Sequence, residues 1–135
     1  MSFDTVRRDI EKRFDANWIV TKVSYDNIDF EPPNRKGKEY WVRLRIFEDA
    51  ANRMNIGNPG IHRTSGTIII ELYAPLNVGT NTLRSYASDA ATIFRDKQFN
   101  GITCQEAIPT NVGELDGWFI YNVSIPFYYD GRYAV

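Results

Sequence analysis

Strict alternation of apolar and polar residues in two segments is the feature that most constrains this chain. In YWVRLRIFED, residues 40–49, the apolar Val42, Leu44 and Ile46 alternate with bulkier or charged residues, and GTIIIELYA, residues 66–74, repeats the pattern. A period of two indicates a β-strand with one face against a core. The closing segment GWFIYNVSIPFYYDG places a row of large residues on one face: Phe119, Tyr121, Val123, Ile125 and Phe127. The sequence therefore predicts a fold organised around a sheet.

Two other segments repeat their apolar residues with the period of an α-helix. Ser2 is placed to cap the first, whose apolar face is Phe3, Val6, Ile10 and Phe14. The second begins near Thr80 or Thr82 and is ended by Gly101, after Phe99. Its apolar face is Leu83, Tyr86, Ala87, Ala90 and Phe94.

Shorter segments complete the predicted order of elements. Residues 18–23 are interpreted as a short strand, and the polar Asp26–Glu39, with its Pro-Pro pair, as a long mobile loop. ITCQEAIPTNV and the aromatic closing segment form the last two strands, joined through GELDG. We expect one α+β domain over residues 1–135, with a mixed, mostly antiparallel sheet of four to five strands and both helices packed on one face.

Charge balance and cysteine content exclude several classes of function. The 135 residues contain 16 Lys and Arg against 17 Asp and Glu, so a net charge of −1 gives no general attraction to nucleic acid or to an acidic membrane. Cys104 stands alone and cannot form an intrachain disulfide or a multi-cysteine metal site. The charged N-terminal segment does not resemble a signal peptide, and no apolar run approaches the ~20 residues that span a bilayer. We expect a soluble, cytoplasmic protein.

The glycine-rich segment NIGNPGIHRTSG, residues 55–66, raises the question of a phosphate site. Its glycine spacing from Gly60 approaches that of a Walker loop, but the lysine is missing and the segment leads into a strand instead of a helix. A dinucleotide-binding fingerprint fails for the same reason. The segment is therefore interpreted as a turn shaped by its glycines and Pro59.

His62 is the only histidine, so any Ser-His-Asp or Cys-His mechanism would have to use it. Ser65 and Cys104 lie in no nucleophile motif, the carboxylates show no spacing that pairs them, and a zinc site lacks supporting ligands. A solvated or hydrogen-bonding loop role for His62 is favoured. The sequence predicts no enzyme, no cofactor and no metal site.

Aromatic residues make up 14% of the chain, more than one small core is expected to enclose. Trp41, Arg43, Arg45 and Phe47 share the strand face opposite the core, where they can stack nucleic-acid bases or meet another subunit. The near-neutral charge favours the subunit interface. Without an oligomer, a sizeable apolar patch would stay exposed: Trp41, Phe47, Ile69 and Tyr73.

Three motifs carry a resemblance to a known family. RTSGT turns into an apolar strand, PLNVGT opens a helix, and PFYYD ends the closing aromatic strand. Together with the N-terminal helix and YWVRLRIF, they make most of the chain similar to the tail terminator proteins of long-tailed phages and prophages.

The resemblance implies a small α+β protein that forms a ring, expected to be a hexamer, on the finished tail tube. Such a ring stops tube polymerisation and provides the surface for head joining. The implied partners are other copies of the chain, the tail tube protein and a head–tail connector protein, in the virion tail and, during assembly, in the host cytoplasm. His62, Arg63 and Thr64 would then lie at a ring surface, beside the mixed face of Trp41 to Phe47.

Two alternatives remain open from the sequence. The nearer one is another head–tail joining or neck protein, which would also form a ring but bind different neighbours. The other is a small-ligand-binding domain or an enzyme that uses His62 with nearby carboxylates.

Overall fold

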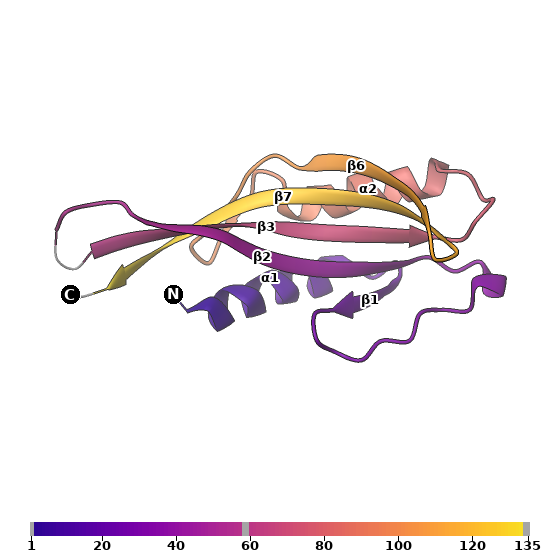
Figure 1. The fold of residues 1–135 in the computed structure, drawn as a ribbon, viewed down its shortest axis with the longest axis horizontal. Helices are drawn as coiled ribbons and strands as arrows, with labels where there is room; N and C mark the ends of the chain where they lie inside the picture. Colours follow the sequence, from indigo (N-terminus) through magenta and orange to yellow (C-terminus); the bar gives the residue numbers. More distant parts are fainter. Residues whose placement is uncertain (1, 58–59, 134–135) are drawn as a thin grey trace.

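A seven-stranded sheet curls around two helices (Figure 1). The computed structural model describes residues 2–57 and 60–133. In chain order the elements are α1 (Phe3–Asn17), β1 (Lys22–Tyr25), the 3-10 helix η1 (Arg35–Gly37), β2 (Trp41–Arg53), β3 (Gly60–Ala74), α2 (Asn81–Phe94), β4 (Gln98–Phe99), β5 (Ile102–Cys104), β6 (Ile108–Leu115) and β7 (Trp118–Tyr133).

Three long strands form the middle of the sheet, in the order β2, β3, β7. β3 pairs antiparallel with β7 from Gly60 opposite Tyr133 to Ala74 opposite Phe119. The other edge of β7 is shared, because β6 pairs with its first half and β5 with its second half. β1 pairs parallel with β2, and β4 pairs antiparallel with β5. Because β6 and β5 follow one another along the same edge of β7, the sheet contains short strands in addition to its long ones.

The prediction of a sheet of four to five strands is therefore wrong. Gln98 and Phe99, taken as the end of the second helix, form β4 instead. The helix ends at Phe94, because Arg95 leaves the helical conformation and Asp96 has a positive φ of 53°. ITCQEAIPTNV, taken as one strand, contributes to two, which pair with different halves of β7.

The prediction of a turn over residues 55–66 is wrong from Gly60 onward, because Gly60–Gly66 is the first half of β3. These residues gain backbone partners on both sides, from β2 and from β7, and this pairing overrides the low strand propensity of glycine. Gly66 lies where β2 bulges between Glu48 and Ala50, and a Cβ there would be 2.2 Å from the Phe47 carbonyl oxygen. Pro59 lies outside the described residues.

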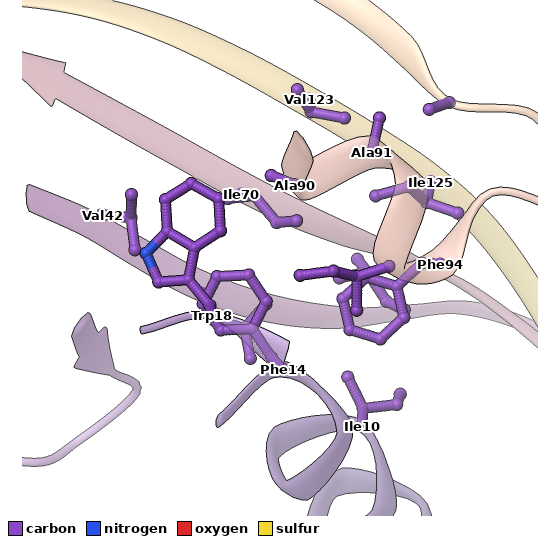
Figure 2. Packing of buried hydrophobic residues seen from close by; sticks show 14 of the residues in the cluster. Ile10, Phe14, Trp18, Val42, Ile70, Ala90, Ala91, Phe94, Val123 and Ile125 are labelled. Carbon is purple, nitrogen blue, oxygen red and sulfur yellow. The ribbon is translucent and has the colours of Figure 1, made fainter. Parts of the chain in front are cut away.

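The two helices cover the inner face of the sheet and enclose one core. The alternating residues predicted to face inward are buried there, with Val42 and Leu44 at 1% and 2% exposure and Ile68 and Ile70 at 0%. Figure 2 shows Phe14 from α1 and Trp18, which follows that helix, in one cluster with Phe94 from α2 and the inward side chains Val42, Ile70, Val123 and Ile125 of the strands. The rings of Phe14 and Phe94 stack with centroids 6.2 Å apart.

α1 begins as its sequence predicts, but the residue that follows its end does not start a strand. The Ser2 hydroxyl accepts a hydrogen bond from the Thr5 backbone N–H at 3.0 Å, which caps the first turn. Trp18, expected in a strand, is the C-terminal cap of this helix and stacks on Phe14 with centroids 5.6 Å apart. The first strand is accordingly displaced along the chain, to Lys22–Tyr25.

Replacing Phe14 by alanine should lower the free energy of unfolding by about 3–5 kcal/mol, because its fully buried ring joins the two helices. Denaturant unfolding measures this. Phe3→Ala on the same helix, at a side chain 66% exposed, should change stability by no more than ~0.5 kcal/mol. Equal effects of the two substitutions would contradict this account of the core.

Candidate functional site

The outer face of the sheet, which the helices do not cover, carries the four residues predicted on the mixed face of β2. Trp41, Arg43, Arg45 and Phe47 alternate with the core residues, so they share this side of the strand. β3 adds Thr67, Ile69, Glu71 and Tyr73 opposite them. The described structure thus brings the four residues into one row.

Trp41 is packed within the protein, with 5% of its surface exposed. Its ring stacks on Tyr73 with centroids 3.8 Å apart and an interplanar angle of 7°, and it meets Trp118 edge to face. Phe30, from the segment predicted as a mobile loop, also stacks on Trp41, with centroids 5.1 Å apart. Trp41, which was expected to belong to an exposed apolar patch, is therefore covered by other residues of the same chain.

A groove of about 410 Å³ remains beside this aromatic cluster, and its volume is within the range of ligand-binding sites. We call it the end groove; its lining residues are Pro32, Trp41, Arg43, Glu71, Tyr73, Val112, Leu115, Asp116, Trp118 and Ile120. Burial raises the pKa of the Tyr73 hydroxyl, with a further contribution from the Glu71 carboxylate. The end groove is thus lined by both aromatic and charged side chains.

Two polar atoms of groove residues are buried without a hydrogen-bond partner among the described residues: Nε1 of Trp41 and Oε1 of Glu71. The nearest guanidinium nitrogen to the latter is Nη1 of Arg43, at 3.9 Å, which is an ion-pair distance but not a hydrogen bond. Buried polar groups are rarely left unpaired, because each costs about 1–3 kcal/mol. The residues that line the end groove therefore include one donor atom and one acceptor atom that lack a hydrogen bond, both enclosed by the protein itself.

Arg45 and Phe47 form the more exposed half of the row. The Arg45 guanidinium lies 4.7 Å from the Phe47 ring centroid, and its Nε is 3.7 Å from Oδ1 of Asp26. Phe47 is 37% exposed. These contacts hold the side chains against the protein while leaving part of the aromatic ring accessible.

The other predicted site residues lie in a projecting three-stranded ribbon. β2, β3 and β7 continue past the helices, as the left side of Figure 1 shows. We call this extension the arm: residues 50–53, 60–66 and 128–133. His62 and Arg63 are partly exposed within it, and Thr64 is buried at 9% exposure. They are strand residues, not turn residues, and His62 lies opposite Gly131 of β7 and Arg53 of β2.

Arg63 fastens two strands of the arm together. Its Nε and Nη2 donate to the two carboxylate oxygens of Asp130 on β7, at 2.9 and 3.0 Å, a bidentate pair. The guanidinium also lies 4.1 Å from the Tyr128 ring centroid. The Arg63 guanidinium holds the pKa of the Asp130 carboxyl below its usual range.

We call residues 53–57, at the end of the arm, the arm tip; it exposes apolar side chains that the sequence interpretation did not single out. Met54 is 52% exposed and Ile56 99% exposed. Arg53 holds this tip in shape, because its Nε donates to the Asn55 carbonyl at 2.7 Å and its Nη2 to the Gly57 carbonyl at 2.6 Å. An isoleucine inside an Asn- and Gly-rich turn was the available sequence signal.

Cys104, one of the two nucleophiles considered from the sequence, lies in the core of the protein. Cys104 is 3% exposed, and burial raises the pKa of its thiol to about 11. Within residues 2–57 and 60–133, no group of three or more His, Cys, Asp or Glu side chains is placed to hold a metal ion. Among the described helices, none has the length and apolar character needed to cross a membrane.

Comparison with known proteins supports the fold and leaves the function open. No protein-family model matches the chain, and no curated protein does. A solved structure whose name describes no function matches with a TM-score of 0.68 and 20% sequence identity, over 100% of this chain and 99% of that one. At this identity the likeness concerns the fold alone.

The Arg63–Asp130 pair predicts a pH dependence. Because the pKa of Asp130 is lowered in the folded state, its contribution to stability is present above the ordinary Asp value of about 3.9 and is lost as the pH falls through the lowered pKa. In an NMR titration, Arg63→Gln should raise the pKa of Asp130 to its ordinary range. Arg95→Gln, at a cation paired with Glu106 instead, should leave it unchanged; a wild-type pKa already in the ordinary range would exclude the pair in solution.

Cys104 should react slowly with a thiol reagent such as Ellman's reagent. With a pKa of about 11, the thiolate fraction at pH 8 is roughly 100-fold smaller than for an exposed cysteine, and burial restricts access further. The same reaction in denaturant gives the control rate. Rapid labelling of the native protein would show that this thiol is accessible.

Proposed function

We propose that the protein is a phage tail terminator, which assembles as a ring on the end of the tail tube, stops tube polymerisation and provides the surface for head joining. The motifs RTSGT, PLNVGT and PFYYD support the family assignment. The ring is expected to be a hexamer, and its partners are copies of itself, the tail tube protein and a head–tail connector protein. It acts in the virion tail after assembly in the host cytoplasm.

One structural observation carries the proposal: both ends of the long sheet display apolar side chains to solvent. Met54 and Ile56 lie at the tip of the arm, and Val112 and Leu115 lie beside the end groove, 47% and 55% exposed. Exposed apolar groups bordered by polar residues are typical of protein–protein contact sites. A protein that must join copies of itself and a tube needs at least two such surfaces.

Purified protein added to polymerising cognate tail-tube subunits should shorten the tubes and leave a distinct ring at their ends. Negative-stain electron microscopy measures both the tube lengths and the end structures. Tube subunits incubated without the protein provide the control lengths. Tubes of unchanged length with no bound protein, formed by competent subunits, would contradict the tail terminator assignment.

The same assay separates the proposal from its alternatives. A different joining or neck protein would form rings without capping tubes. An enzyme that depends on His62 would lose turnover in a His62→Ala variant, whereas a tail terminator has no turnover to lose.

A further inference from the structure

We propose that the arm tip of one subunit docks into the end groove of the next, so that copies of this chain join head to tail. The inference rests on the proposed ring function and specifies the contact that builds the ring. The occupant of the groove is a second copy of the chain, and the docking residues of that copy are Arg53, Met54 and Ile56.

The tip is a formed protrusion with apolar side chains and one positive charge. Arg53 binds the carbonyls of the turn, and Asn55 Oδ1 accepts a hydrogen bond of 2.6 Å from the Ile61 N–H. Gly60 permits this packing, because a Cβ there would lie 2.9 Å from Cζ of Arg53. Since residues 53–57 are already held by these hydrogen bonds, less conformational entropy is lost when they bind. Ile56, almost fully solvated, is the side chain with most to gain from burial.

The end groove complements the tip in two respects. Its rim residues Val112 and Leu115 are exposed and apolar, matching the side chains that the tip presents. The charged residues that line it are Arg43, Glu71 and Asp116, one positive and two negative, whereas the tip carries the positive Arg53.

The position of the two surfaces makes the contact intermolecular. β2 begins at Trp41 in the end groove and reaches Arg53 at the arm tip, so its 13 residues separate them by about 40 Å. The two surfaces thus occupy opposite ends of the sheet, as Figure 1 shows for the ends of β2, β3 and β7. Because different patches meet, the contact is heterologous, the kind that closes into a ring when the rotation between neighbours allows it.

Sedimentation velocity of four single variants tests the docking. Ile56→Glu at the tip and Leu115→Glu in the groove should each weaken self-association roughly 10- to 100-fold, because each places a charge where an apolar side chain is buried. Ile19→Glu matches the first in exposure, at 89%, and lies outside both surfaces. Ile108→Glu matches the second on β6, at 53% exposure, and does not line the end groove. Both controls should associate like the wild type.

A mixture of the two defective variants gives the sharper result. The Leu115→Glu subunit keeps its tip and the Ile56→Glu subunit keeps its groove, so an equimolar mixture should form a heterodimer and no larger species. Normal association of either variant alone, no heterodimer in the mixture, or a wild-type chain that stays monomeric at every concentration would each overturn the docking. Circular dichroism confirms that the variants are folded.

Failure of this contact is distinguishable from failure of the proposed function. If the Ile56→Glu variant associates and caps tubes normally, the ring stands and its subunit contact lies elsewhere. If the wild type associates through the tip but tubes grow unchanged, the docking stands and the tail terminator assignment fails.

Discussion

Backbone pairing of β3 on both sides is the constraint on which the rest of the structure depends. β3 is hydrogen-bonded to β2 along one edge and to β7 along the other, over nearly its whole length. Its alternate residues therefore divide the molecule: Ile68, Ile70 and Leu72 face the helices, while Ile69, Glu71 and Tyr73 face outward. The inward face of β3 contributes to the core, its outward face near Tyr73 contributes to the end groove, and its first half forms part of the arm.

The parts of the fold that sequence predicts well are those where local pattern and tertiary environment agree. Alternation identified the inward residues of β2, β3 and β7, and helical spacing identified Val6, Ile10 and Phe14. The failures concern segments whose state depends on distant partners. Gly60–Gly66 has the composition of a turn and becomes a strand because β2 and β7 flank it, and Gln98–Phe99 continues an apolar pattern but pairs with β5.

Prediction of the candidate site was also limited to features that depend on local sequence. Successive side chains of a strand point to opposite faces, so the outward direction of four alternate residues follows from the sequence: Trp41, Arg43, Arg45 and Phe47. The burial of Trp41 does not, because part of its cover comes from Phe30, which lies in a polar segment with no local signal for such a contact. The end groove needs residues from β2, β3, β6 and β7 together, and only the sheet order brings them side by side.

The three strands that form the arm come from distant parts of the chain, and this affects the order of folding. Two of its strands, β2 and β3, are consecutive in the chain, but the third is β7, which follows every other element. Pairing between such distant segments forms late, since the entropy of closing a long loop is lost before the contacts form. β2 and β3 alone would make an isolated hairpin, which is marginally stable at best. The projecting ribbon, and any assembly that depends on it, therefore becomes available only once the C-terminal strand has joined, so a partly synthesised chain lacks the completed surface.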